Sequence, residues 1–248
     1  MLSRNFRLQK IGDIKWLQEN YDFSRVSYSI DELVVIDISR GKKSIENFSS
    51  NLKLLADGCF VPITAGGGIH SVETARHLLR SGADKIILNS ELFLKNGFVD
   101  QLASQFGQQC IVGSMDLKLD GSGNYLVLSD NGSRIEPGDA SYWIEAIVNS
   151  AVGEIYLNSI DRDGTGQGLD MNLLDNLPAN FSKPIIMAGG VGSSVHIIEG
   201  LADDRVNAVA TANLLNFIGN GLENARKSAF LNGINLPLWD EQIFKNSK

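Results

Sequence analysis

Short apolar runs alternate with segments of helical spacing along almost the whole chain. The runs have the length and composition of buried strands, and the segments between them repeat apolar residues at three- and four-residue intervals. The predicted strands are Phe6–Gln9, Leu33–Asp37, Phe60–Thr64, Lys85–Leu88, Cys110–Met115, Ile155–Leu157, Pro184–Met187 and Ala208–Thr211. The predicted helices cover about residues 13–28, 45–56, 72–79, 98–106, 140–148, 172–177, 195–201 and 222–230. This alternation favours an α/β fold with a closed parallel barrel, a (βα)8 TIM barrel, over an open doubly wound sheet.

One segment, from Leu119 to Ile135, interrupts the alternation. It contains two turn signals, Gly121-Ser-Gly-Asn124 and Asp130-Asn-Gly132. Such signals between short extended runs predict an inserted hairpin.

A repeat inside the chain supports the barrel. Thr64-Ala-Gly-Gly-Gly-Ile-His-Ser-Val matches Met187-Ala-Gly-Gly-Val-Gly-Ser-Ser-Val, about half a chain length further on. Each copy is followed by a helix and then by a strand that ends in small polar residues. We therefore expect one domain of two half-barrels, about residues 1–108 and 109–235, with a C-terminal tail at 236–248.

Composition narrows the functional classes. A length of 248 residues is usual for one (βα)8 barrel, and 43% hydrophobic residues can fill its core. The net charge of −7 and the scattered basic residues argue against a nucleic-acid partner. No apolar run reaches membrane-spanning length and no signal-peptide core is evident, so we expect a cytoplasmic protein. Cys59 and Cys110 have no metal-ligand spacing and are interpreted as buried thiols, and no metal or cofactor is expected.

Candidate catalytic carboxylates follow two of the predicted strands. Asp116 ends one strand, and Asp163 lies in the polar, glycine-rich loop after the next. In parallel barrels the chemistry lies at these carboxyl ends, so both side chains should reach the mouth. Two carboxylates facing across a cavity can divide the roles of general acid and base. Asp37 and Asp161 could instead bond to backbone N–H groups and hold their loops.

The glycine triplets of the repeat are candidate phosphate sites. Glycines at a strand end let the backbone approach a ligand, and the N–H groups of the following turn and helix can hold a phosphate. Two symmetric loops suggest a ligand with a phosphate at each end. The alternative is that these glycines only make tight turns.

Several of these motifs together resemble a known family. Asp31-Glu-Leu with Ile-Asp37, Gly66-Gly-Gly-Ile, Gly82-Ala-Asp-Lys85 with Asn89-Ser90, Asp116, Gly153-Glu154, Ser159-Ile-Asp-Arg-Asp-Gly-Thr165 and Ala188-Gly-Gly190 resemble the cyclase subunit of imidazole glycerol phosphate synthase. The resemblance runs from about Ile30 to Pro237. It implies a barrel that takes ammonia from a glutaminase partner at its N-terminal face. The ammonia is added to a doubly phosphorylated ribulosyl intermediate, which is then cyclised and cleaved.

The resemblance also implies residue roles. The family's second catalytic aspartate falls on Asp116, and Asp163 is our second candidate. The phosphate positions fall on Gly67, Gly68, Asn89 and Ser90 in one half, and on Gly164, Gly189, Gly190 and Asn213 in the other. Asp161 and Thr165, in the loop before Gly166, are further candidate substrate-binding residues. Three of the four charged residues of the family's ammonia gate fall on Glu32, Lys85 and Glu154, and the fourth on Asn5, with Arg4 and Arg7 as substitutes. The alternative for this trio is a structural salt-bridge layer.

The chain departs from the family at its front. The family's first strand ends in a Cys-Leu-Asp motif whose aspartate is the first catalytic acid, and an essential lysine follows in a long loop. Here the run is Leu8-Gln-Lys-Ile-Gly-Asp13, with Ile11 at the aspartate position. The repeat agrees, since 42 residues separate Asp116 from Asn158 but only 28 separate Gln9 from Asp37. Asp13 could replace the acid, and Lys10 or Lys15 the lysine, although Asp13 is better explained as a helix cap.

Four functions therefore remain open. The first is a cyclase-type lyase that uses ammonia, and the second is a paralogue that passes ammonia to another acceptor, as in sugar amidation for surface polysaccharide. Loss of the first acid favours the second. A non-catalytic subunit is the third, and the sister isomerase of histidine biosynthesis is a weaker fourth because it needs no ammonia gate.

Overall fold

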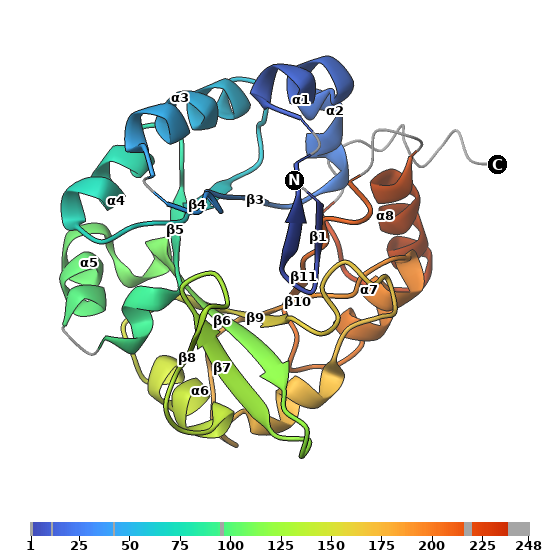
Figure 1. The fold of residues 1–248 in the computed structure, drawn as a ribbon. Coiled ribbons are helices and arrows are strands. Elements are labelled where there is room, and N and C mark those ends of the chain that lie inside the picture. Colours follow the sequence, from blue (N-terminus) through green and yellow to red (C-terminus); the bar gives the residue numbers. More distant parts are fainter. Residues whose placement is uncertain (1, 11, 42, 95–96, 216–219, 238–248) are drawn as a thin grey trace.

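The computed structural model describes residues 2–10, 12–41, 43–94, 97–215 and 220–237. Parallel strands curl into a sheet that is surrounded by helices (Figure 1). The strands lie in chain order as β3 (Leu33–Ile36), β4 (Ile63–Gly66), β5 (Lys85–Leu88), β6 (Ile111–Leu119), β9 (Glu154–Ser159), β10 (Ile185–Ala188) and β11 (Ala208–Val209). This confirms the predicted α/β fold of the TIM-barrel type.

The helices cover the outer face of this sheet. They are α3 (Ile45–Ala56), α4 (Val72–Leu79), α5 (Phe98–Phe106), α6 (Ala140–Val148), α7 (Ser194–Leu201) and α8 (Gly221–Leu231). Short 3-10 turns, η1 (Ser27–Ser29), η2 (Ser90–Phe93), η3 (Gln108–Cys110) and η4 (Met171–Asn176), complete the connections. None of the described helices is both long and apolar enough to cross a membrane.

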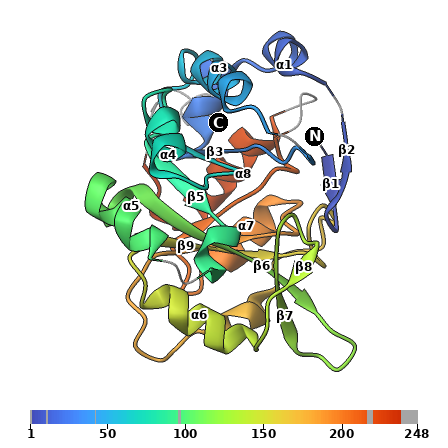
Figure 2. The ribbon, with the colours of Figure 1, turned by 60° about the vertical axis from the view of Figure 1, so that its left-hand side comes forward.

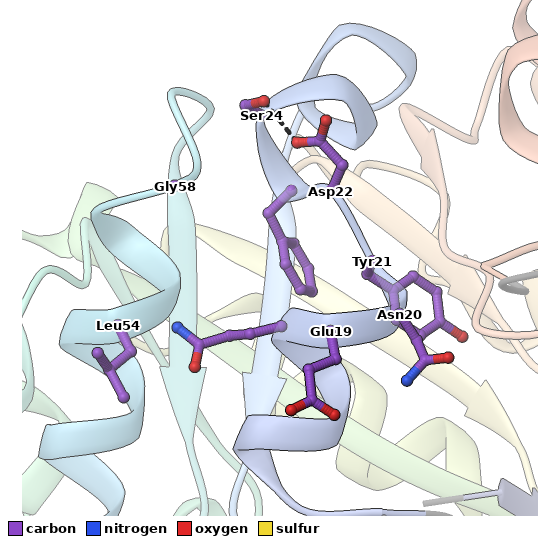
Figure 3. Close-up of a pocket in the computed structure, with 9 residues that line it drawn as sticks. Glu19, Asn20, Tyr21, Asp22, Ser24, Leu54 and Gly58 are labelled. Atoms are coloured by element: carbon purple, nitrogen blue, oxygen red, sulfur yellow. Dashed lines mark hydrogen bonds between the residues drawn. The ribbon is translucent and has the colours of Figure 1, made fainter.

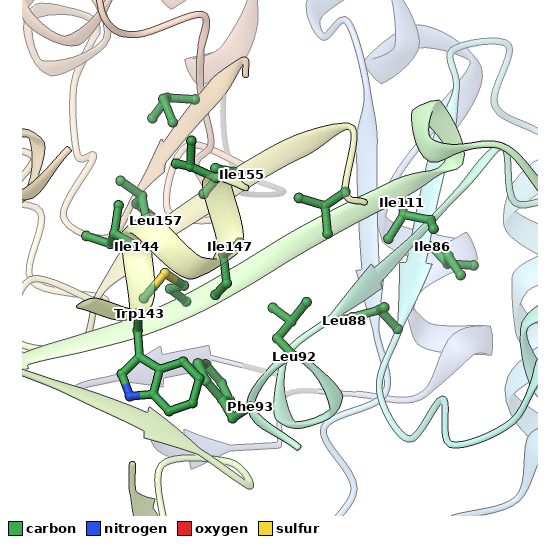
Figure 4. Close-up of a cluster of buried hydrophobic side chains, with 14 of the residues drawn as sticks. Ile86, Leu88, Leu92, Phe93, Ile111, Trp143, Ile144, Ile147, Ile155 and Leu157 are labelled. Atoms are coloured by element: carbon green, nitrogen blue, oxygen red, sulfur yellow. The ribbon is translucent and has the colours of Figure 1, made fainter. Parts of the chain in front are cut away.

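The main core lies between the sheet and these helices. Every second strand residue points outward, so Ile86, Ile111 and Ile155 belong to one buried cluster with helix residues such as Ile144 and Ile147 (Figure 4). All five side chains are fully or almost fully buried. This packing fixes the register of the strands, and therefore the height of the residues on their inner faces.

The predicted insertion is an antiparallel hairpin. Strand β6 continues past the barrel to Leu119 and pairs with β7 (Tyr125–Ser129), which pairs with β8 (Arg134–Ile135). The hairpin projects beyond the carboxyl ends of the barrel strands (Figure 2).

The prediction that Phe6–Gln9 is the first barrel strand is wrong. β2 (Arg7–Gln9) pairs antiparallel with β1 (Leu2–Arg4) in a separate two-stranded sheet. The physical reason is the turn at Asn5 and Phe6, whose φ values of 50° and 60° reverse the chain. In the described residues, the barrel sheet therefore has seven parallel strands. Its end strands have one neighbour each, β4 for β3 and β10 for β11.

The predicted helix over residues 13–28 is also divided. α1 (Ile14–Asn20) ends at Tyr21, which is extended, and α2 (Phe23–Val26) starts again after Asp22. The cap residue Asp22 accepts a hydrogen bond from the backbone N–H of Arg25. An Asx cap inside a helical pattern starts a new helix, which the apolar spacing alone does not reveal.

Candidate functional site

The centre of the barrel mouth is the carboxyl group of Asp116. Strand pairing places Asn158 directly opposite it, and the Asn158 side-chain amide donates to Asp116 Oδ1 at 2.9 Å. Asn89, at the end of β5, donates to Asp116 Oδ2 at 3.2 Å and to the carbonyl of Ser114 at 3.1 Å. The two amides fix both carboxyl oxygens.

The pKa of Asp116 is raised to about 6. Burial is the main cause and the nearby Asp163 adds to it, whereas the hydrogen bond from Asn158 acts in the opposite direction. Tyr156 lies on the same face of β9, two residues before Asn158, and burial together with these two aspartates raises the pKa of its hydroxyl. A carboxyl group that titrates near neutral pH suits proton transfer.

Asp163 is held by the N-terminal hairpin. The Ser3 hydroxyl donates to Asp163 Oδ2, and the backbone N–H of Phe6 donates to the same oxygen at 3.3 Å. The backbone N–H of Asn5 also donates to the Asp163 carbonyl at 2.9 Å. The structure thus brings both predicted carboxylates to the mouth, where Asp116 is held by side chains of the barrel strands and Asp163 by the N-terminal hairpin.

The hairpin β1–β2 lies across the mouth (Figure 1). It packs so closely on the loop after β9 that a Cβ at Gly164 would be 1.9 Å from the Ser3 carbonyl oxygen. Its tip also meets the tip of the β7–β8 hairpin, where a Cβ at Gly132 would be 2.9 Å from Phe6 Cδ2. The expectation that Asn5, Arg4 or Arg7 supplies the fourth gate residue at the barrel bottom is therefore wrong, because the turn at Asn5 carries these residues to the opposite end.

The first glycine loop lies between β4 and α4. Gly67 has a φ of 99°, and a Cβ there would be 2.2 Å from the Asp37 carbonyl oxygen, so only glycine allows this approach. Gly68 follows with a φ of 82°. Of the predicted partners, Asn89 points to Asp116 instead, and the Ser90 hydroxyl oxygen accepts from the backbone N–H of Asp130 at 3.0 Å.

The second glycine loop repeats this geometry. Gly189 has a φ of 90°, and a Cβ there would be 2.5 Å from the Ser159 carbonyl oxygen. A Cβ at Gly190 would be 2.0 Å from the Gly168 carbonyl oxygen. The Asn213 amide lies close by, 3.4 Å from the place of a Cβ at Gly166.

Asp161 and Thr165 serve the loop itself. Asp161 Oδ2 accepts from the backbone N–H of Leu119 at 2.8 Å, and the Thr165 hydroxyl donates to the carbonyl of Arg162 at 2.7 Å. Asp37 likewise accepts from the N–H of Ser39 at 2.9 Å. Asp37 and Asp161 therefore hold their own loops by bonding to backbone N–H groups, which is the alternative role that the sequence offered for them.

The predicted gate trio meets at the other end of the barrel. Lys85 Nζ lies 2.7 Å from Glu32 Oε2 and 2.7 Å from Glu154 Oε1, and the Thr64 hydroxyl donates to Glu32. Burial alone would lower the pKa of Lys85, but its hydrogen bonds to Glu154 and Glu32 outweigh burial and raise it. We call Glu32, Lys85 and Glu154 the charged layer.

The suggested substitutes for the missing front residues do not form a site. Asp13 caps α1 by accepting from the backbone N–H of Trp16 at 2.9 Å, which lowers the pKa of this exposed carboxyl. Lys15 is exposed and lies 3.9 Å from Glu19. Lys10 is exposed after β2, and Ile11 is outside the described residues.

One surface pocket lies away from the mouth. It measures about 610 Å³ and is lined by residues 18–24 of α1 and α2 with Leu54 and Gly58 (Figure 3). None of these lining residues is a predicted site residue, so this pocket does not locate the chemistry.

Sequence reasoning missed two side chains at the mouth. Asn158 was not predicted as a site residue, although it lies near the end of β9 opposite Asp116 and its position in the repeat could have indicated a contact. Lys43, which packs on Gly68, gave no signal because the path of its loop sets its position.

Comparisons with known proteins identify similar sequences. The histidine biosynthesis protein family matches residues 18–219. A protein of Parasynechococcus marenigrum is 45% identical over 232 residues, which cover 92% of this chain and 84% of the relative. A protein of Pseudomonas aeruginosa is 35% identical over 190 residues, covering 77% and 76% respectively. Both relatives carry the provisional name imidazole glycerol phosphate synthase subunit hisF2.

Proposed function

The chain belongs to the histidine biosynthesis protein family, and from that membership we propose that it is a cyclase-type subunit of imidazole glycerol phosphate synthase. It would add ammonia to a phosphorylated ribulosyl substrate, close the imidazole ring and release the by-product as a lyase. The names of the two relatives support this type of reaction.

The observation that carries the proposal is the setting of Asp116. Its carboxyl group has a pKa of about 6, lies at the mouth, and is fixed through both oxygens by Asn89 and Asn158. At neutral pH such a group can take a proton from the attacking nitrogen and return one to the leaving group. Gly68 and Gly190 lie in the two glycine loops, whose backbone N–H groups would bind the substrate phosphates.

A glutaminase partner would dock at the end that carries the charged layer. Two carboxylates and one ammonium give this layer a net negative charge, and the side chains are 21–25% exposed. Tyr28 and Phe60, just before β3 and β4, stack edge to face with ring centroids 4.9 Å apart and are 40% and 52% exposed. Exposed aromatic side chains are typical anchors of protein interfaces. Ammonia would then travel up the barrel, about 13 Å from Glu154 to Asn158.

The test is cyclase turnover by the purified chain with ammonium salt and the ribulosyl intermediate. We expect turnover that Asp116→Asn abolishes, whereas Asp204→Asn, at an exposed aspartate, leaves it unchanged. A pull-down with a glutaminase subunit tests the partner. Turnover that survives Asp116→Asn would contradict the role of Asp116.

A second candidate is a paralogue that passes ammonia to another acceptor. It is favoured by the hairpin at the mouth, which occupies Asp163, and by the missing first-strand acid. Binding of a glutaminase subunit without turnover of the ribulosyl intermediate would support this candidate.

A further inference from the structure

Lys43 packs directly on the first glycine loop. It lies between β3 and α3, and its Nζ donates a 2.6 Å hydrogen bond to the carbonyl oxygen of Asp37. Its aliphatic stem crosses Gly68 so closely that a Cβ at Gly68 would be 2.7 Å from Lys43 Cδ. The half-buried side chain is therefore part of the loop surface and not a solvated arm.

The ammonium group of Lys43 lacks a charged partner in the described part of the chain. Its hydrogen bond is to a neutral carbonyl, and none of the ion pairs of the described residues includes it. A positive charge thus lies at Gly68, in the loop that leads into α4. The second glycine loop differs. At the Cβ position of Gly190, the nearest atoms belong to the Gly168 carbonyl and to Cβ of Arg162, and not to a lysine.

We propose that Lys43 binds the phosphate at the first glycine loop, by moving its ammonium group from the Asp37 carbonyl to a phosphoryl oxygen. This rests on the proposed function, which supplies a phosphorylated substrate, and it assigns a binding residue that makes the two phosphate sites unequal. A hydrogen bond from an ammonium group to a dianion is stronger than one to a neutral carbonyl. The lysine stem can rotate over the short distance involved because Gly68 has no side chain.

The test is a titration of the whole chain with inorganic phosphate. Binding at each loop is followed by NMR through the backbone amide signals of Gly68 and Gly190. We expect Lys43→Met to weaken phosphate binding at Gly68 about tenfold and to leave binding at Gly190 unchanged. Lys43→Arg should restore part of the affinity. Lys53→Met, at an exposed lysine of α3, is the matched control.

Equal affinity at Gly68 in the wild type and Lys43→Met would overturn the proposal, as would an equal loss at both glycines. Absence of phosphate binding at Gly68 in the wild type would also overturn it. Failure of the proposed function is separate, since a chain without cyclase turnover can still bind phosphate through Lys43.

Discussion

Asn158 donates a 2.9 Å hydrogen bond to Asp116, the residue directly opposite it on the neighbouring strand. The amide stabilises the charged carboxylate and so lowers the pKa of Asp116 against the effect of burial. We expect Asn158→Leu to raise this pKa above 6. A carbon NMR titration of the aspartate carboxyl groups measures the change, with Asn172→Leu at an exposed asparagine as control. An unchanged or lower pKa would contradict the role of the amide.

The raised pKa of Asp116 also predicts a pH-dependent stability. The folded state holds this proton up to a pH of about 6, whereas the unfolded chain loses it near 3.8. The group's contribution to the unfolding free energy is therefore fully present below pH 3.8 and is lost as the pH rises through 6. The loss should amount to as much as about 3 kcal/mol.

Asp116→Asn removes this titration. In urea unfolding, the free-energy difference between the wild type and Asp116→Asn should therefore favour the wild type more at pH 4 than at pH 7.5. A difference that does not change with pH would show that Asp116 titrates normally in the folded protein.

The charged layer predicts a second pH effect. Lys85→Met leaves the carboxylates of Glu32 and Glu154 without their shared cation, at 25% and 22% exposure. We expect a loss of about 2 kcal/mol of unfolding free energy at pH 7, less than for a fully buried pair. The loss should shrink above pH 10.5, because the raised pKa of Lys85 makes its stabilising contribution fully present below that pH and lost as the pH rises further. Lys53→Met is the control, and a loss that is independent of pH would indicate packing alone.

Local patterns predicted most helices and most strands, although the predicted helix at 172–177 is the 3-10 turn η4. The bounds of α4, α5 and α6 follow from apolar spacing and from polar or glycine residues at their ends, and Ser71 and Asp139 cap two of them. The two glycine loops also follow from the sequence, because a repeated glycine at a strand end indicates a close approach of the backbone.

The sequence did not predict contacts that arise from the path of the chain. Arg7–Gln9 has the pattern of a strand, but the strand it pairs with depends on the turn at Asn5 and Phe6. Both residues adopt a positive φ although neither is a glycine. The pairing of Lys85 with Glu154 was predicted only through the family resemblance, because 69 residues separate them. No local pattern placed Ser3 on Asp163 or Lys43 on Gly68.

The close packing of the N-terminal hairpin on Gly164 gives the last prediction. A Cβ at Gly164 would be 1.9 Å from the Ser3 carbonyl oxygen, and backbone atoms cannot give way cheaply. Gly164→Ala should therefore displace the hairpin and free Asp163 from Ser3 and Phe6. Gly97→Ala is the matched control, because its φ of 74° is close to the 69° of Gly164 but no atom lies within 4 Å of its Cβ position.

Hydrogen exchange of residues 3–9 measures the displacement. The Asn5 amide should exchange at least about tenfold faster in Gly164→Ala, because its hydrogen bond to the Asp163 carbonyl is lost. In Gly97→Ala the same amide should exchange at the wild-type rate, since that variant adds only local backbone strain. Equal exchange of Asn5 in both variants would show that the hairpin does not depend on its contact with Gly164. Faster exchange only in Gly164→Ala would make the hairpin a separable cover of the mouth, whose effect on turnover can then be measured with Asp116 intact.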